Sequence, residues 1–396
     1  MIKKLVLRNF RGIANAEVSI APVTVLTGAN NSGKSSVMYG LLTLKNILSN
    51  PNQPLDSFFN FIFMNLGGFK ETIHLKEEEK KRITIGIHCE DGDVKSSYHA
   101  SLGKAQSTLE VEEQTPAKLS LKLDVTFPYS LNLSTGVEAD GLKLTWNGIS
   151  PTVTAKEAGQ EERATLVASG ILLPVSDIKG VDFVPLKRGF IKPIFSPVPV
   201  QQQLISEDEV ATLVANDRDL EGKINYWLER IVNRNFHARP TLGTANFYLQ
   251  TNDRDTGFVC DLVNEGFGTN QLVYLLAKAL RKDQTTICIE EPEIHLNPAA
   301  VLRLVDVLVE VAKDLNRSFV ISTHSEHIVV ALLTKLAQGA IKANDLRVYH
   351  IRKEKARSVI EEQRVNEKGQ IEGGLKAFYD TELQQMRDFL SVTEEA

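Results

Sequence analysis

The stretch Gly28-Ala29-Asn30-Asn31-Ser32-Gly33-Lys34-Ser35 decides the fold of this 396-residue chain. It matches the phosphate-binding loop pattern G-x-x-x-x-G-K-[ST]. A β-branched apolar run from Val23 to Leu26 leads into it, and a helix-like run from Ser36 to about Leu48 leads out. This strand–loop–helix context is the setting that the motif requires. We therefore predict a nucleotide site, in preference to an ordinary glycine turn between a strand and a helix.

The residue types of the loop suit nucleotide chemistry. Glycines let the backbone curl so that its N–H groups face the phosphates, and the helix N-terminus adds its positive dipole. Lys34 is placed to reach the β- and γ-phosphates, where it would assist catalysis, and the Ser35 hydroxyl is placed to ligate Mg²⁺. The predicted cofactors are ATP and Mg²⁺. The predicted contact residues of the loop are Gly28, Asn30, Asn31, Ser32, Gly33, Lys34, Ser35 and Ser36.

Composition narrows the class of protein. Hydrophobic residues make up 42% of the chain and charged residues 24%, which is ordinary for a globular protein. The net charge of −5 gives no global basic field, so any nucleic-acid contact must come from a local patch. The three cysteines are scattered without zinc-ligand spacing. No signal peptide or membrane-spanning run is evident, and we expect a cytoplasmic protein without membrane contact.

The hydrophobic pattern of the first half predicts strands around the loop and then a β-rich region. Short strands are expected within residues 2–27, and a helical hairpin is expected in the Phe-rich stretch 51–68. From about Thr72 to Pro199 apolar and polar residues alternate, as they do over residues 83–87. This alternation predicts an antiparallel meander with one solvent-facing side.

The second half has a helical pattern that then alternates with strands. Ser206-Glu-Asp-Glu209 is a capping box, and apolar spacing up to Ile231 predicts one long amphipathic helix. From Asn246 onward strands and helices alternate, which predicts a parallel sheet covered by helices. A last helix is expected at about Lys376–Leu390. We expect four segments, namely residues 1–71 (first half of the nucleotide-binding head, with the loop), 72–200 (β-rich insert), 201–245 (helical segment) and 246–396 (second half of the head).

Two adjacent carboxylates, Glu290 and Glu291, end the buried-type strand Thr285–Glu290. In phosphate-loop ATPases a strand beside the loop strand carries the acid on the Mg²⁺ side, and the next acid polarises the attacking water. Successive residues at a strand end point in different directions, so two acids can serve two functions. We assign Glu290 to the metal shell and Glu291 to the water; an acidic turn after a core strand is the alternative.

Two further features complete the predicted site. His324 follows the next strand, where a neutral imidazole could accept one hydrogen bond and donate another between the γ-phosphate and the water. Gly266 and Gly268 precede a helix, which makes a second anion site. Because the loop already provides one phosphate site, this second one suggests a nucleotide shared with another subunit.

In this order, the motifs resemble those of the ABC-type ATPases of the SMC/RecF clan, and within it the AAA-labelled ATPases related to the OLD (overcoming lysogenisation defect) proteins. Leu7-Arg8-Asn9-Phe10-Arg11-Gly12 is similar to the clan's I-x-N-F-R start, which adds Arg11 to the implied nucleotide-binding residues. Residues 290–298 resemble the EEPExHLHP stretch, and Ser322-Thr323-His324-Ser325 resembles the His loop. Gly266-Phe267-Gly268-x-x-Gln271 resembles the ABC signature.

The resemblance implies an α/β fold: a P-loop NTPase head of ABC type, with a mixed or parallel sheet flanked by helices and an antiparallel β-rich insert. It also implies a homodimer or higher homo-oligomer, in which the loop of one head and the signature of the other close on each ATP. Gly266 stands near the usual signature serine, and Gln53 is the one candidate for a Q-loop glutamine. The residues after Ile351 contain no D-x-D pair, so we expect the Toprim nuclease domain of full-length OLD proteins to be absent.

These features favour an ATP-hydrolysing, dimerising switch that controls a separate effector, such as a nuclease in antiphage defence; the effector and the antiphage role are implied by the resemblance alone. A DNA-associated ATPase of the repair or clamp type is the alternative. Basic residues cluster within 187–192, 230–239 and 353–357, although acids lie nearby and the net charge is negative. A transporter ATPase subunit is less favoured, because the β-rich insert is long and the Leu-Ser-Gly-Gly-Gln signature is missing.

Overall fold

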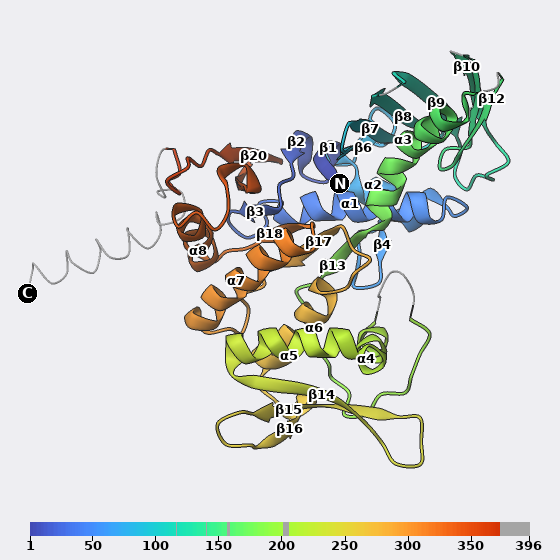
Figure 1. The fold of residues 1–396 in the computed structure, drawn as a ribbon. Helices are drawn as coiled ribbons and strands as arrows, with labels where there is room; N and C mark the ends of the chain where they lie inside the picture. Colours follow the sequence, from blue (N-terminus) through green and yellow to red (C-terminus); the bar gives the residue numbers. More distant parts are fainter. Residues whose placement is uncertain (116, 140, 157–158, 201–205, 373–396) are drawn as a thin grey trace, which may run out of the picture.

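The strand that leads into the loop belongs to a six-stranded sheet, whose order is β13 (Val181–Val184), β17 (Thr286–Glu290), β18 (Ser318–Ser322), β3 (Val23–Thr27), β19 (Leu346–Glu354) and β20 (Arg357–Gln363). This computed structural model describes residues 1–115, 117–139, 141–156, 159–200 and 206–372 (Figure 1). The first five strands run parallel, and β20 pairs antiparallel with β19. Every residue of β3, β17 and β18 is buried, as expected for parallel strands covered on both faces. The predicted α/β class is confirmed.

A second six-stranded sheet is antiparallel throughout, in the order β2 (Ile13–Ser19), β1 (Ile2–Phe10), β6 (Ile83–Asp91), β7 (Val94–Leu102), β8 (Ser107–Thr115) and β9 (Leu119–Val125). The meander expected around residues 83–125 is confirmed. The two N-terminal strands extend the same sheet, because β1 pairs with β6 in the register Leu5 to Ile87.

Helices lie on both faces of the parallel sheet, which divides the core into two clusters. On one face, the helices α1 (Lys34–Ser49) and α3 (Glu161–Lys179) pack with the antiparallel sheet and with Leu26, Cys288 and Val320. Their strand neighbours Val25, Ile289 and Ile321 point to the other face, as the two-residue period of a strand requires. That face is covered by α5 (Arg218–Val232), α6 (Phe267–Ala279), α7 (Pro298–Asp314) and α8 (Glu326–Ala337).

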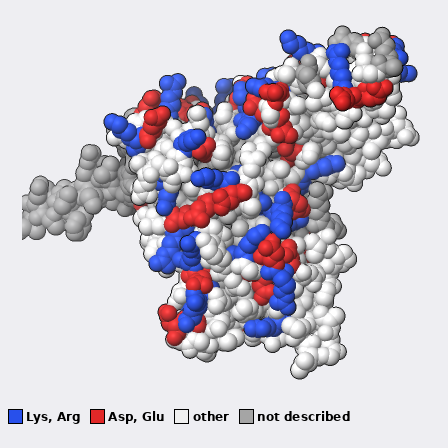
Figure 2. Space-filling view, viewed as in Figure 1, with Lys and Arg blue, Asp and Glu red and all other residues white. Residues whose placement is uncertain are grey.

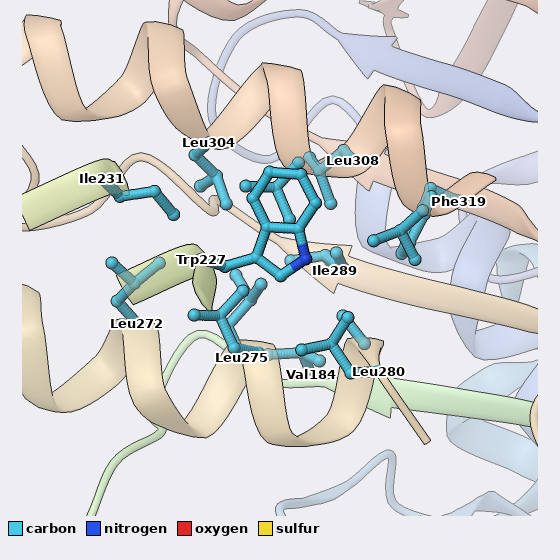
Figure 3. Packing of buried hydrophobic residues seen from close by; sticks show 14 of the residues in the cluster. Val184, Trp227, Ile231, Leu272, Leu275, Leu280, Ile289, Leu304, Leu308 and Phe319 are labelled. Carbon is cyan, nitrogen blue, oxygen red and sulfur yellow. The ribbon is translucent and has the colours of Figure 1, made fainter. Parts of the chain in front are cut away.

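Trp227 links α5 to this second cluster. Figure 3 shows its indole between Leu304 and Leu308 of α7 and Leu275 of α6, above Ile289 of the sheet. The indole is largely buried, with 8% of Trp227 exposed. Burial of such an aromatic side chain contributes about 2–3 kcal/mol, so this contact fixes α5 against the helices that flank the site.

The prediction of strands alone for residues 72–199 was wrong at its C-terminal end. Residues 161–179 form α3, and β13 joins the parallel sheet. Ala164, Val167, Ile171 and Ile178 are buried at helical spacing, a signal that the sequence contains. Pro174 inside the helix weakens that signal, because proline usually interrupts a helix.

Two other predictions were also wrong. The Phe-rich stretch forms a 3₁₀ turn (Leu55–Phe59), the short strands β4 (Asn60–Phe61) and β5 (Met64–Asn65), and α2 (Phe69–Thr72), not a helical hairpin. The expected long helix is two helices, α4 (Glu207–Asn216) and α5, because Asp217 is extended and its side chain accepts from Leu220 N–H at 3.0 Å. The capping box at Ser206 is present. The helix expected at 376–390 lies outside the described residues.

Two small antiparallel sheets complete the fold, and both lie away from the loop (Figure 1). They consist of β10 (Thr135–Ala139), β11 (Leu142–Trp146) and β12 (Pro151–Ala155), and of β14 (Arg234–Pro240), β15 (Phe247–Asp253) and β16 (Val259–Asp261). Within the described ranges, none of the helices combines the length and apolar character needed to cross a membrane.

A buried acid between β8 and α3 gives the first testable prediction. Glu113 is 1% exposed, and neither of its carboxylate oxygens has a hydrogen-bond partner among the described residues. Burial raises the pKa of Glu113 to about 7. Because this folded-state pKa lies above that of the unfolded chain, the folded state loses stability as pH rises from about 4.5 to 7. Glu113→Gln is expected to raise the free energy of unfolding by about 1–3 kcal/mol at pH 8.

Urea unfolding of Glu113→Gln and wild type at pH 8 and pH 5 measures this effect, which should shrink towards pH 5. Glu112→Gln is the control, because Glu112 is the exposed neighbour on the same strand. An equal change at both pH values would contradict the assignment.

Candidate nucleotide site

The loop, the acid pair and the histidine come together because β3, β17 and β18 are parallel neighbours. Their carboxyl ends meet at one edge of the sheet, where ligands of such sheets commonly bind. A cavity of about 250 Å³ lies there, lined by Arg11, residues 30–36, Glu290, Glu291 and His324. All of these residues were candidates from the sequence, and their roles remain predictions.

The loop backbone requires glycine at both ends. Gly28 has φ 133° and Gly33 has φ 116°, values that side-chain-bearing residues rarely adopt. A Cβ atom on Gly28 would lie 2.0 Å from the Ile351 carbonyl oxygen, and one on Gly33 would lie 2.6 Å from Ser358 Oγ. The neighbouring strands β19 and β20 therefore leave no room for a side chain. Gly28 does not line the cavity, and its carbonyl instead accepts from Lys34 Nζ at 2.8 Å.

Lys34, His324 and Glu291 form a connected polar group. Lys34 Nζ lies 2.8 Å from His324 Nε2, which lies 3.2 Å from Glu291 Oε1. Burial, followed by the nearby Lys34 charge, lowers the pKa of His324 below its usual value, so the imidazole is neutral near pH 7. Because an ammonium group only donates, Nε2 accepts from Lys34 in this arrangement. Burial also lowers the pKa of Lys34.

The His324 segment is held by a third acid that the sequence analysis did not assign. Glu293 Oε1 accepts from Thr323 Oγ1 at 2.5 Å and from the His324 backbone N–H at 3.2 Å. Burial raises the pKa of Glu293. The Glu293 carboxyl thus orients the segment that carries the imidazole.

The two adjacent acids have different surroundings. Glu290 is 8% exposed; its Oε1 accepts from Tyr39 O–H at 3.0 Å, and its Oε2 accepts from Leu186 N–H at 3.2 Å. Glu291 adopts φ 41°, and its backbone N–H donates to the Ser322 carbonyl at 2.8 Å. The left-handed backbone turns Glu291 away from the strand direction and towards His324, so one acid is enclosed and the other faces the polar group.

The donor set fits Mg²⁺ held jointly with a nucleotide. In the described part of the chain, no cluster of three His, Cys, Asp or Glu side chains could hold a metal by itself. Ser35 and Glu290 line the same cavity, and both hydrogen-bond with Tyr39. Mg²⁺ is commonly bound by one or two protein oxygens together with substrate phosphates. Ser35 and Glu290 are therefore the residues that would hold it.

Four lining residues were not predicted as site residues: Tyr39, Met64, Leu186 and Ser322, the last of which was quoted only within the His-loop resemblance. The Arg11 guanidinium lies over the Tyr39 ring, 5.5 Å from its centroid, and burial lowers the pKa of Arg11. Tyr39 lies one turn into α1 after Ser35, so helical spacing could have identified it. Met64 and Leu186 come from segments whose fold the sequence did not predict.

The signature glycines lie outside this cavity. Gly266 precedes α6 and lines a different cavity with Arg234, Asp253 and Glu265. A Cβ on Gly268 would lie 2.5 Å from the His295 carbonyl oxygen, so this glycine has a packing role within the chain. Among the described residues of one chain, neither glycine lines the cavity that the loop lines.

The Q-loop candidate Gln53 is also outside the loop cavity. It lines a neighbouring cavity with Phe61 and Phe63. The interpretation of Gln53 as a nucleotide-sensing glutamine is therefore not supported by its position. The segment that does reach Glu290 from this side is Leu186, through its backbone N–H.

Tyr39→Phe is expected to raise the Mg²⁺ concentration for half-maximal ATP hydrolysis about 10-fold, with a smaller change in kcat. The substitution removes the hydrogen bond that orients the Glu290 carboxylate, and loss of such a supporting bond typically costs about 10–100-fold in metal affinity. A Mg²⁺ titration of the ATPase rate measures it. Tyr226→Phe removes an exposed hydroxyl on α5 and serves as the control; an unchanged Mg²⁺ requirement in Tyr39→Phe would refute this role.

Comparison with known proteins agrees with this geometry. A family model described as "AAA domain, putative AbiEii toxin, Type IV TA system" matches residues 23–331. The Old nuclease of Escherichia phage P2 is 23% identical over 367 residues, covering 84% of this chain; the chain spans only 57% of that protein's length.

Solved structures resemble the chain at the level of fold. An SMC head bound to the C-winged helix domain of ScpA has a TM-score of 0.50 at 11% identity, with 92% of this chain and 98% of that chain covered. The SMC head domain from Thermotoga maritima has a TM-score of 0.43 at 12% identity, with 91% and 98% covered. The first likeness supports a P-loop ATPase head fold. Because the matched family range covers most of the chain and includes the loop, the acid pair and His324, this chain belongs to the AAA-domain family described as putative AbiEii toxin.

Proposed function

We propose that the chain binds ATP with Mg²⁺ at this cavity, hydrolyses it, and uses the nucleotide to pair two heads in a switch that controls a separate effector. One observation carries the catalytic part. The loop lysine, the histidine and the second acid are linked through contacts of 2.8 and 3.2 Å, at the carboxyl ends of parallel strands.

The residues have distinct roles in this proposal. Lys34 would leave the loop carbonyls and bind the β- and γ-phosphates, and His324 would then be free to contact the γ-phosphate. Glu291 would orient a water whose oxygen attacks the γ-phosphorus as the bond to the β–γ bridging oxygen breaks. The products are ADP and inorganic phosphate, and the water proton passes to the Glu291 carboxylate. Mg²⁺, held by Ser35 and Glu290, would neutralise phosphate charge.

The pairing of heads is supported by the position of Gly266. It lies at the N-terminus of α6, in a cavity separate from the loop cavity. A helix N-terminus binds phosphate through free N–H groups and its dipole. A second copy, facing the opposite way, would bring this N-terminus to the nucleotide of the first.

The effector and the setting are proposed from resemblance. By resemblance to the OLD-related ATPases, we propose that this head controls an effector on a separate protein of a cytoplasmic antiphage system. The division into head, β-rich insert and helical segment stays part of the same proposal.

Phosphate release from ATP by the purified chain tests the catalytic part. We expect hydrolysis that requires Mg²⁺ and is abolished by chelation with EDTA. ATP binding without any phosphate release, in the presence of Mg²⁺, would leave a nucleotide-binding switch and refute the hydrolytic role.

The DNA-associated alternative has less structural support. Arg188 hydrogen-bonds inside the chain, Lys192 pairs with Asp208, and Arg234 pairs with Asp253. Figure 2 shows positive and negative side chains intermixed on the face in view. Binding of DNA that weakens steeply with salt would favour this alternative. The transporter alternative gains no support from the family to which the chain belongs.

A further inference from the structure

The segment Pro185–Phe190, which follows β13, contacts the acid pair from the side opposite the loop. Arg188 Nη1 donates to the Glu290 carbonyl at 2.7 Å and to the Pro185 carbonyl at 3.1 Å, and Nη2 donates to the Glu291 carbonyl at 2.9 Å. One guanidinium group therefore spans two consecutive backbone carbonyls. Its planar, fixed arrangement of donors suits such a double contact better than a lysine ammonium would.

Glu291 needs such a contact because its backbone conformation is unfavourable. A φ of 41° places it in the left-handed region, which costs roughly 1–2 kcal/mol for a residue with a Cβ. Its N–H donates to the Ser322 carbonyl, and its carbonyl accepts from Arg188 at 2.9 Å and, less closely, from Ile294 N–H at 3.2 Å. With both backbone groups held, the direction of the carboxylate towards His324 is set.

The other end of the segment is attached to α6. Phe190 N–H donates to Asn270 Oδ1 at 2.8 Å, and Asn270 Nδ2 donates back to the Phe190 carbonyl at 2.9 Å. Asn270 Nδ2 also donates to the Leu262 carbonyl at 2.9 Å. Asn270 is 6% exposed. The segment is thus fixed at Phe190 and delivers the Arg188 guanidinium to a defined place beside the acids.

We propose that Arg188 is a positioning residue, which keeps Glu291 in its left-handed conformation and thereby directs its carboxylate to the attacking water. This role rests on the proposed function, because it is Glu291 that would handle the water. Arg188 does not line the cavity, so it acts through the two acids and not through the nucleotide.

The kinetic test compares Arg188→Met and Arg188→Lys with wild type. We expect Arg188→Met to lower kcat about 100-fold, the cost typical of a misplaced catalytic group, while the KM for ATP stays within about 3-fold because the loop is untouched. Arg188→Lys should restore part of kcat, because one ammonium reaches one carbonyl but not both. Lys187→Met, at the exposed neighbouring position, should behave as wild type.

A second measurement does not depend on hydrolysis. Hydrogen–deuterium exchange of the peptide covering residues 286–293, without nucleotide, should be faster at the Glu291 amide in Arg188→Met, and unchanged in Lys187→Met. If wild type does not hydrolyse ATP, the proposed function fails, and the exchange result still decides whether Arg188 holds the Glu291 backbone.

Two outcomes overturn the proposal. One is unchanged kcat together with unchanged exchange at Glu291 in Arg188→Met. The other is a rise in the KM for ATP at unchanged kcat, which would place Arg188 in nucleotide binding. If Arg188→Met does not fold, Arg188→Lys gives the same comparison, and a wild-type kcat in that variant refutes the role.

Discussion

Glu291→Gln is expected to lower the rate of ATP hydrolysis by about 10²–10⁴-fold, the range typical of a general acid–base group, while ATP binding stays within about 3-fold. The amide is close in size to the carboxylate but cannot accept the proton of the attacking water. Glu291 follows β17 and is not part of the phosphate-binding loop itself, so its replacement leaves the loop backbone unchanged. Single-turnover phosphate release, together with fluorescence titration of an ATP analogue, measures both quantities.

The matched control is Glu310→Gln, which makes the same chemical change on the exposed face of α7. Its rate should equal that of wild type. Hydrolysis at the wild-type rate in Glu291→Gln would mean that another group activates the water. His324 would be the first candidate, because it is the neighbouring polar side chain.

Lys34→Met is expected to weaken ATP binding about 100-fold or more, and hydrolysis at a fixed ATP concentration should fall with it. The ammonium group now contacts the carbonyls of Gly28 and Ala29, and it would exchange them for phosphate oxygens. Hydrogen bonds to charged groups contribute about 1.5–3 kcal/mol each, which corresponds to about 10- to 100-fold in affinity for each. The same fluorescence titration measures the loss.

Lys313→Met, on the exposed surface of α7, provides the control for this loss of positive charge. Because the loop carbonyls lose a donor in Lys34→Met, circular dichroism of the variant should first show that it is folded. Unchanged ATP affinity in a folded Lys34→Met would mean that the nucleotide binds elsewhere, and the loop assignment would be abandoned.

The central sheet was predictable because two independent signals agree along its strands. Continuous apolar runs before the loop and before Glu290 are typical of strands buried on both faces. The helical patterns between them indicate crossover connections, which require parallel pairing. The alternation expected from Asn246 onward is present, for example in β18 and α8.

The parts that could not be predicted depend on contacts between distant segments. Leu186 reaches Glu290 only because β13 pairs with β17, and no pattern of residues indicates that pairing. In the sequence, Arg188 is part of a basic cluster that is typical of a protein surface. In the structure, its guanidinium group donates to backbone carbonyls. For α3, the helical spacing of buried residues was present but was outweighed by the alternating pattern before it.

The structure also explains why the signature assignment remains a proposal. Gly268 is required by its close approach to the His295 carbonyl, a reason that needs no nucleotide. A Cβ atom on Gly266 would meet open space. Packing within this chain therefore does not require a glycine there, and a role for Gly266 would depend on a binding partner. The loop, the acid pair and His324 lie together within one chain. The α6 N-terminus would meet a nucleotide only if a second copy brought it there.

The most direct test of the nucleotide-driven pairing is the solution mass of Glu291→Gln, measured by sedimentation velocity with and without ATP and Mg²⁺. Because this variant is expected to bind ATP without hydrolysing it, the paired state of two heads should accumulate. The measured mass should be that of a monomer without ATP and should double when ATP is added. A mass that is the same with and without bound ATP would contradict the switch.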